Sequence, residues 1–387
     1  MKKYNFVSAF TNITGTNNRT RTILGEIDGE KIVLTTDFCH RKKQYYEAWE
    51  TEDKQQVCMH VPAYKKNLSI ARLWSHLVFA WRVMSYLKAL NRKPDAVYCT
   101  MPTSSSAYVC AKYCKKHGVK LVIDVIDLWP DSLLPLMKGK QLIKTMLYPW
   151  THLTLYAYRH ADVIMGESVK YAQEAKKYNQ KAEMLPVYLG IDMSIVNKVK
   201  AEKPVVLEKS DDEIWIAYAG SLGTSYDFLT LLDAVKSIHR KYRYKLWFVG
   251  DGIRHKEIAD YITANELNAE ITGFVCYEQL LGYLCYCDIA VNIFRDNTKV
   301  VYSYKFNDYV ATNCFVLNSL EGETADMVDE YRIGRNFNFS DKPLSKVLAD
   351  TFEHWDEYVT WKGNQQKLID DKLDKAKIYS VVKDIFG

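Results

Sequence analysis

The chain has 387 residues, a length that suggests two or three domains rather than one core. Its apolar content of 48% and charged content of 26% are those of a globular protein. The formal net charge of +5 is small and lacks the clustered basic residues of a nucleic-acid-binding surface, so no nucleic acid is expected as a partner.

Cysteine spacing and hydropathy narrow the class of protein further. The nine cysteines form no C-x-x-C pair and have no histidines at zinc spacing, which predicts reduced packing residues and no metal site. No stretch approaches the roughly 20 apolar residues of a membrane-spanning helix. The N-terminal sequence MKKYNFVSAFTNITG lacks the sustained apolar run of a signal peptide, so we expect a cytoplasmic protein.

Strand and helix patterns alternate along the first half of the chain. Strands are predicted at 4–10, 29–36, 95–101, 120–127 and 161–168, and the segment 183–192 closes this half. Helices are predicted at 69–91, 105–118 and 146–161. This alternation predicts an α/β fold with a parallel sheet. The charged, aperiodic segment 197–213 is the expected interdomain linker.

Four segments of the second half combine strands, glycine loops and helices. They are IWIAYAGSLGTSYDFLTLLDAV (214–235), YKLWFVGDGIRHKEI (244–258), ITGFVCYEQLLGYLCYCDIAVNIF (271–294) and RDNTKVVYSYKFNDYVATNCFVLN (295–318). The last segment predicts a basic loop, a helix with Lys305 and Asp308 on one face, and a buried strand. Since a helix start suits a phosphate, this helix is a candidate ligand site. The alternative is a surface helix with a single Lys–Asp pair.

Together these four segments resemble the nucleotide-sugar domain of retaining GT-B glycosyltransferases of family 4 (group 1), in which a P-x-K-x-x-E-Y motif takes the place of the Lys305–Asp308 helix. VIDVIDLWPDSLLP (122–135) resembles the WbuB-like branch, whose members build bacterial O-antigen and capsule units. The resemblance implies a GT-B fold of two Rossmann-like domains facing a central cleft. The expected parts are an acceptor domain at 1–196, a nucleotide-sugar domain at 214–360, and a terminal helix at 361–387 that crosses back onto the first domain.

The resemblance also implies the site residues. Asp127 and Lys305 are the expected catalytic residues, although many relatives have a histidine near the position of Asp127. Acceptor contacts are expected from Arg19, Arg21 and Asp131. Donor contacts are expected from Gly15, Gly220, Ser221, Gly223, Gly250, Gly273, Phe274, Arg295, Lys299, Ser303, Tyr304 and Asp308. The alternatives are that Asp127 and Asp131 are turn and cap residues, and that the loop at 11–22 is a surface hairpin.

The chain departs from the family pattern at three positions. The family has an arginine and a lysine that clamp the donor diphosphate, and these positions are Ser221 and Tyr226 here. The first of two family glutamates falls at Val300, while Asp308 stands at the second. The charge on a departing diphosphate must then be stabilised by the basic residues of 295–305 and by backbone N–H groups of the glycine loop.

The resemblance implies transfer of a sugar, from a UDP-sugar in preference, to a lipid-linked glycan, with retention of configuration and without a metal or other cofactor. The expected partners are a nucleotide-sugar, a polyprenyl-linked acceptor and the inner-membrane surface, because 63–92 and 136–160 interleave basic and aromatic residues. These aromatics could instead belong to the core. Two other functions stay open: a non-catalytic nucleotide-sugar-binding subunit and a GT-B-shaped UDP-sugar epimerase.

Overall fold

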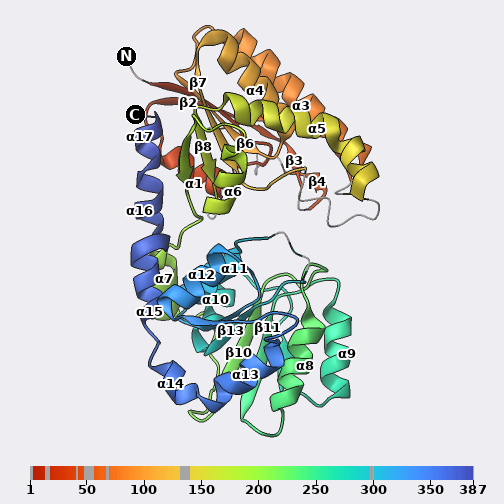
Figure 1. Cartoon of the computed structure of the whole chain (residues 1–387), viewed down its shortest axis with the longest axis vertical. Coiled ribbons are helices and arrows are strands. Elements are labelled where there is room, and N and C mark those ends of the chain that lie inside the picture. The colour runs from red at the N-terminus through yellow and green to blue at the C-terminus, as the bar shows by residue number, and fades with distance from the viewer. Residues whose placement is uncertain are drawn as a thin grey trace. The chain divides into compact units, whose positions relative to one another are not determined.

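The chain folds as two compact units, Met1–Tyr188 with Lys377–Gly387, and Leu189–Ala376 (Figure 1). The structure is a computed structural model that describes residues 3–13, 18–40, 42–47, 56–66, 69–130, 140–296, 298 and 300–386, with the backbone alone at 140–144 and 146. Each unit is a parallel sheet with helices packed on it, so the predicted α/β fold of two Rossmann-like domains is confirmed.

Within the described residues, the strands of the first large sheet follow the order β5-β2-β1-β6-β7-β8-β9. They are β1 (Tyr4–Ser8), β2 (Glu30–Thr36), β5 (Val57–Met59), β6 (Ala96–Met101), β7 (Lys120–Val125), β8 (Val163–Gly166) and β9 (Glu183–Pro186). Neighbouring strands are parallel. A short hairpin, β3 (Phe38–Cys39) and β4 (Gln44–Tyr45), follows β2. β2 lies on one side of β1 and β6 on the other, so the strand order reverses at β1. A crevice for ligands is expected at the carboxyl ends of these strands.

Helices cover both faces of this sheet. They are α1 (Arg19–Glu26), α3 (Ile70–Ala89), α4 (Ser104–His117), α5 (Lys140–His160) and α6 (Val169–Lys176), with α16 (Lys375–Ser380) and α17 (Val382–Phe386) from the C-terminus. On one face, Val7 and Val122 of the sheet share a buried cluster with Ile23 of α1 and Phe386 of α17. The remaining helices include α4, which packs against both α3 and α5 (Figure 1). The C-terminal helix is thus part of the first unit's core.

A buried ion pair fastens α1 to the sheet. Arg19 donates to both carboxylate oxygens of Asp124 on β7, from Nε and from Nη2, at 2.8 Å each. Its Nη1 donates to the carbonyl of Val187 at 2.5 Å, and the hydroxyl of Tyr98 donates to Asp124 at 2.5 Å. Although burial opposes the charge, the adjacent carboxylate of Asp124 leaves the pKa of Arg19 well above its ordinary value. The predicted acceptor contact of Arg19 is therefore corrected: its guanidinium is only 3% exposed and holds the fold.

In the second unit, the described strands follow the order β12-β11-β10-β13-β14-β15, and all pairs are parallel. They are β10 (Ile214–Ala219), β11 (Tyr244–Val249), β12 (Ala269–Ile271), β13 (Ile289–Asn292), β14 (Phe315–Asn318) and β15 (Gly334–Asn336). The helices are α7 (Met193–Glu202), α8 (Phe228–Ile238), α9 (His255–Ala264), α10 (Tyr277–Tyr286), α11 (Tyr304–Ala311), α12 (Glu323–Tyr331), α13 (Leu344–Glu353), α14 (Trp355–Val359), α15 (Asn364–Leu368) and the π-helical turn η2 (Ile369–Leu373).

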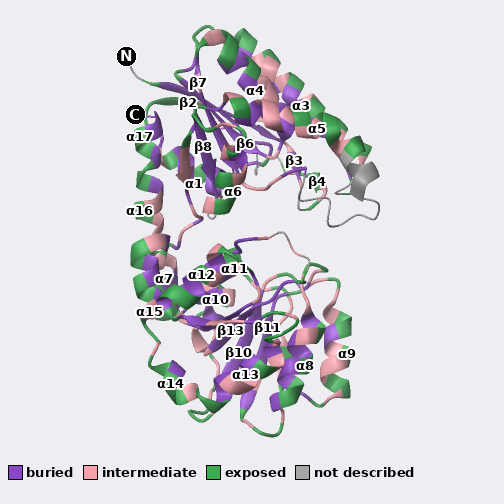
Figure 2. Ribbon diagram, in the orientation of Figure 1, coloured by how far each residue is buried: buried purple, intermediate pink, exposed green. Residues whose placement is uncertain are grey.

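The sheet of the second unit lies between buried helix faces, as Figure 2 shows by the purple interior of the ribbon. One apolar cluster joins α8, α9 and α13 to the strands through Phe228, Ile258, Leu348 and Phe248. The segment 197–213, which was expected to link the domains, contains the second half of α7 and belongs to this unit.

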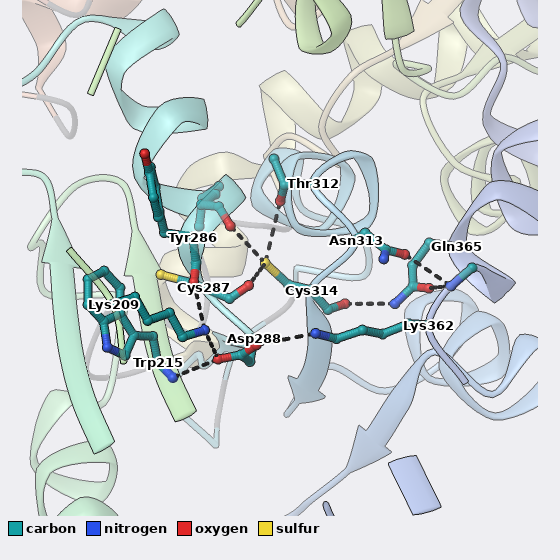
Figure 3. Close-up of polar contacts among 12 residues, drawn as sticks. Lys209, Trp215, Tyr286, Cys287, Asp288, Thr312, Asn313, Cys314, Lys362 and Gln365 are labelled. Atoms are coloured by element: carbon teal, nitrogen blue, oxygen red, sulfur yellow. Dashed lines mark hydrogen bonds and ion pairs between the residues drawn. The ribbon is translucent and has the colours of Figure 1, made fainter. Parts of the chain in front are cut away.

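A polar network ties the C-terminal helices to the start of β13 (Figure 3). Asp288 accepts hydrogen bonds from Lys209, from the backbone N–H of Trp215 at 2.8 Å and from Lys362 at 3.2 Å. Gln365 of α15 donates to the carbonyl of Cys314 at 3.0 Å. Asp288 and Cys314 precede β13 and β14, so these contacts fix the amino ends of the strands and leave their carboxyl ends available for a site.

The buried pair at Arg19 generates a stability prediction. The Arg19→Met variant leaves the carboxylate of Asp124 buried without its cation, so it should lower the free energy of unfolding of the first unit by about 3–5 kcal/mol. Denaturant unfolding followed by circular dichroism measures the loss. The double variant Arg19→Met/Asp124→Leu should recover part of it, and Arg21→Ala, on the exposed side of α1, should change little. A loss below about 1 kcal/mol in Arg19→Met would contradict the structural role.

Candidate functional site

Loops from both sides of the strand-order reversal meet at the carboxyl edge of the second sheet. The loop after β10 contacts the loop after β11: Gly220 N donates to Val249 O at 2.8 Å, and Leu222 N donates to Asp251 O at 2.9 Å. The loop after β13 joins them through Arg295 N, which donates to Ser225 O at 3.1 Å. This is the switch point at which open α/β sheets bind ligands.

Two glycines allow these loops to approach each other. Gly250 has φ +148°, and a Cβ there would lie 2.1 Å from the carbonyl oxygen of Gly220. Gly220 has φ +120°, and a Cβ there would lie 2.6 Å from Cε of Lys305. Because side chains at these two positions would collide with their neighbours, the glycines bring the loop backbone directly over the Lys305 side chain.

Helix α11 is held in place by buried polar contacts beneath its N-terminus. Ser303 caps the helix, accepting from Phe306 N at 3.4 Å, and its hydroxyl donates to Asn292 Oδ1 at 3.0 Å. Asn292 in turn donates to Asn318 at 2.8 Å. The predicted donor contact of Ser303 is corrected accordingly: its hydroxyl is buried and positions the helix that carries Lys305.

The Lys305 side chain lies among aromatic rings. Its Nζ is 3.4 Å from the ring centroid of Tyr226 and 4.2 Å from that of Tyr218, and it donates to the Tyr218 hydroxyl. Burial of the ammonium holds the pKa of Lys305 well below its ordinary value, and the nearby carboxylate of Asp308 offsets this in part. An anion at this position would favour the charged ammonium, so ligand binding and protonation of Lys305 are coupled.

Asp308 lies one turn further along α11 and is held by Tyr277. The Tyr277 hydroxyl donates to Asp308 Oδ1 at 2.7 Å, from the first residue of α10. Burial raises the pKa of Asp308 to about 7, although the Tyr277 hydrogen bond and the charge of Lys305 both act to lower it. A fixed carboxylate next to a cation can accept hydrogen bonds from the hydroxyls of a sugar.

The other predicted donor residues of this unit lie in loops at the carboxyl edge of the sheet and at the start of α11. Gly223 belongs to the loop after β10, and Gly273 precedes Phe274, whose side chain is 83% exposed. Ser221, Arg295 and Tyr304 are exposed as well. Contacts between the loops therefore gather Gly220, Ser221, Gly223, Gly250 and Arg295 at the carboxyl edge of the sheet.

The sequence did not single out the aromatic residues that hold the two charged groups of α11. Tyr218 and Tyr226 surround the Lys305 ammonium, and Tyr277 orients Asp308. The ring of Tyr226, where the family resemblance implied a diphosphate-binding cation, lies against the Lys305 ammonium. No periodic or spacing signal marks these tyrosines, since each meets its partner only through the fold. Arg254 adds no unpaired cation, because it forms an ion pair with Glu257 at 2.5 Å.

The predicted site residues of the first unit lie on different elements of that unit. Asp127 follows β7, is half-buried and acts electrostatically on Arg72. Arg21 is exposed on α1, whose N-cap is Asn18, so the two arginines lie on a helix rather than in the expected loop. Gly15, Asp131 and Lys299 lie outside the described residues. No group of three or more His, Cys, Asp or Glu in the described ranges is placed to hold a metal ion.

Comparison with known proteins places the fold. No protein-family model and no curated protein matches the sequence. Solved structures match over nearly the whole chain. Anabaena Alr3699/HepE in complex with UDP-glucose has a TM-score of 0.65 at 14% identity, covering 99% of this chain and 98% of that one. Sucrose-phosphate synthase from Thermosynechococcus elongatus has a TM-score of 0.70 at 11% identity, covering 100% and 98%. WaaG, a glycosyltransferase involved in lipopolysaccharide biosynthesis, has a TM-score of 0.66 at 13% identity, covering 99% of each chain. The likeness shows the GT-B fold of two Rossmann-like domains.

The raised pKa of Asp308 predicts how the stability of the protein depends on pH. Its folded pKa of about 7 lies above its ordinary value of 3.8, so the folded state binds this proton more tightly than the unfolded state. Stability is therefore lost as pH rises from about 4 to about 7, by at most about 4 kcal/mol. The Asp308→Asn variant lacks this loss, so its melting temperature should rise relative to the wild type across that range. The exposed control Asp296→Asn should show no such trend. A constant difference between Asp308→Asn and wild type at all pH values would contradict the raised pKa.

Proposed function

We propose that the protein is a retaining, metal-independent glycosyltransferase that moves a sugar from a nucleotide-sugar, with UDP as the favoured nucleotide, to a lipid-linked glycan. The role belongs to the synthesis of bacterial surface polysaccharide, such as O-antigen or capsule. The observation that carries the proposal is the position of Lys305 directly beneath the backbone of Gly220, with Asp308 one helical turn away. This places a cation, backbone N–H groups and a carboxylate at one switch point.

Each group of the site suits one part of a nucleotide-sugar. The ammonium of Lys305 and, in the Gly220 loop, the N–H groups of Ser221 and Gly223 suit the diphosphate, since both kinds of group donate hydrogen bonds to anionic oxygens. Asp308, oriented by Tyr277, suits the ribose hydroxyls. The exposed ring of Phe274 offers a surface on which the base stacks. Two of the similar solved structures support this assignment, because HepE was crystallised with UDP and with UDP-glucose.

The proposed reaction breaks the bond between the sugar C1 and the donor phosphate oxygen and forms a bond from C1 to an acceptor hydroxyl on the same face. The acceptor proton moves to the departing phosphate oxygen. Lys305 stabilises the negative charge that grows on the diphosphate as its bond to C1 breaks, which is the step where such a group contributes most. Its position compensates for the exchange of the family's two cations for Ser221 and Tyr226.

Replacement of Lys305 tests this role. The Lys305→Ala variant should keep its fold and lose about 2–4 kcal/mol of transition-state stabilisation, roughly a 30- to 1,000-fold drop in kcat/KM for transfer or for slow hydrolysis of UDP-glucose. Release of UDP measures both reactions. The exposed control Lys256→Ala on α9 should retain normal rates.

The outcomes of that experiment separate the proposed enzyme from a binding subunit. Near-normal kcat/KM in Lys305→Ala would overturn the assigned role. Tight UDP binding by the wild type without any turnover of a panel of UDP-sugars would favour a non-catalytic nucleotide-sugar-binding subunit, the alternative that Ser221, Tyr226 and Val300 motivate.

A stripe of exposed apolar side chains on α3 supports a lipid-linked acceptor at a membrane surface. Ile70, Trp74, Leu77 and Trp81 follow helical spacing and are 86%, 58%, 39% and 67% exposed. No acidic residue occurs from position 54 to 94, while lysines flank the stripe. Tyr64 and Tyr158 of the segments 63–92 and 136–160 are instead buried in the core, whereas Tyr148 is 68% exposed. None of the described helices is long and apolar enough to span a bilayer. A basic helix with exposed tryptophans suits the interface of an anionic membrane.

The stripe generates a vesicle-binding prediction. Trp74→Ser/Trp81→Ser should weaken co-sedimentation with phosphatidylglycerol vesicles by at least tenfold, because it removes two interfacial anchors. Val206→Ser, which changes an exposed apolar residue of the second unit, should bind like the wild type. Equal binding of wild type and the double variant would exclude α3 as the membrane contact.

A further inference from the structure

A second group of basic side chains lies at the carboxyl edge of the first sheet. His40 and Lys43 belong to the β3–β4 hairpin, which follows β2. Arg72 lies in the first turn of α3, and Trp129 follows β7. In a parallel sheet these positions share the edge at which ligands bind, and the reactions proposed above do not use them.

The members of this basic cluster, His40, Lys43, Tyr64 and Arg72, are joined by polar contacts. Arg72 acts electrostatically on Tyr64, whose hydroxyl lies 2.6 Å from Nδ1 of His40. Lys43 Nζ is 3.2 Å from the same nitrogen and 5.1 Å from the ring centroid of Tyr64. The Arg72 guanidinium lies 5.6 Å from the centre of the Trp129 ring. These contacts hold two cations and an imidazole side by side, all of them half-buried.

The electrostatics of the cluster favour an anion. Burial, together with the charges of Arg72 and Lys43, lowers the pKa of His40 to about 4. Burial and the charge of Arg72 also lower the pKa of Lys43. Burial lowers the pKa of Arg72, while the Tyr64 hydroxyl and the carboxylate of Asp127 act to raise it. An added anion would relieve the mutual repulsion of the bases.

Two buried polar atoms beside the cluster lack a partner. Nδ1 of His76 and Nε1 of Trp129 have no hydrogen-bond partner among the described residues, although the two side chains are 1% and 3% exposed. Their ring centroids are 5.6 Å apart, so they adjoin each other and the Arg72 guanidinium. Since buried polar groups are normally hydrogen-bonded, unsatisfied atoms at one place point to a bound group that the free chain lacks.

We propose that Arg72, Lys43, His40 and Tyr64 form a subsite for a phosphate group. A planar guanidinium and an ammonium supply many N–H donors in the arrangement that binds phosphate oxygens. The subsite deepens the proposed function and rests on it for its ligand: the phosphate is that of the lipid-linked acceptor. It takes the place of the anion contact that the sequence assigned to Arg19, whose side chain is committed to Asp124.

Titration with inorganic phosphate tests the site without any sugar transfer. The ring proton signals of His40, identified by their loss in His40→Gln, are followed by NMR in phosphate at constant ionic strength, with sodium chloride as the reference salt. Bound phosphate should raise the pKa of His40 from about 4 towards its ordinary value. Arg72→Gln should weaken phosphate binding roughly 10- to 100-fold, as should Lys43→Gln, which serves if Arg72→Gln folds poorly. Lys88→Gln, a loss of charge elsewhere on α3, should have no effect.

The outcomes decide both the site and its ligand. An unchanged His40 signal in phosphate, or an equal response in Arg72→Gln, would overturn the subsite. Flotation with phosphatidylcholine vesicles, with or without a polyprenyl phosphate, identifies the source: a preference for the polyprenyl phosphate that Arg72→Gln abolishes assigns the acceptor lipid. Phosphate binding without that preference assigns a free phosphate and overturns the acceptor assignment. If UDP fails to bind while phosphate still shifts His40, the proposed function fails and the phosphate site stands.

Discussion

The proposed donor site depends on the reversal of strand order between β10 and β13. Parallel strands on either side of the reversal send their loops to one edge, so the Gly220 loop and α11 meet although more than eighty residues separate them. Several contacts hold the Gly220 loop and α11 in this arrangement. Gly250 allows two loops to approach each other. Ser303 and Asn292, the last residue of β13, hold the start of α11, and Asp288 fixes the amino end of β13.

The two most informative cations of the chain differ in how they are compensated. Arg19 has a bidentate carboxylate partner and is fully buried, so its charge is satisfied within the fold. Lys305 has aromatic rings and a tyrosine hydroxyl around it, and the described residues give it no ion pair. A partly buried base without an ion pair among the described residues is suited to an anionic ligand.

The sequence was sufficient for the elements whose signals are local. Strand and helix alternation predicted both parallel sheets, and the Lys305–Asp308 spacing predicted a helix with both groups on one face, as α11 shows. It failed where a residue's role depends on a distant partner. Arg19 pairs with Asp124, which is 105 residues away in the sequence. The polar residues around Arg19 predicted a loop, but they include Asn18, which caps a short helix there. Tyr277 and Tyr226 contact Asp308 and Lys305 only through the fold, so their spacing carries no signal.

The proposed function requires that the second domain bind a nucleotide-sugar. Thermal unfolding with UDP, GDP, dTDP and their glucose conjugates, each with and without EDTA, tests it most directly. One nucleotide, expected to be UDP, should raise the melting temperature by the same amount with and without EDTA, since bound ligand stabilises the folded state. A stabilisation abolished by EDTA would contradict metal independence. No stabilisation by any of these nucleotides would contradict the donor site itself.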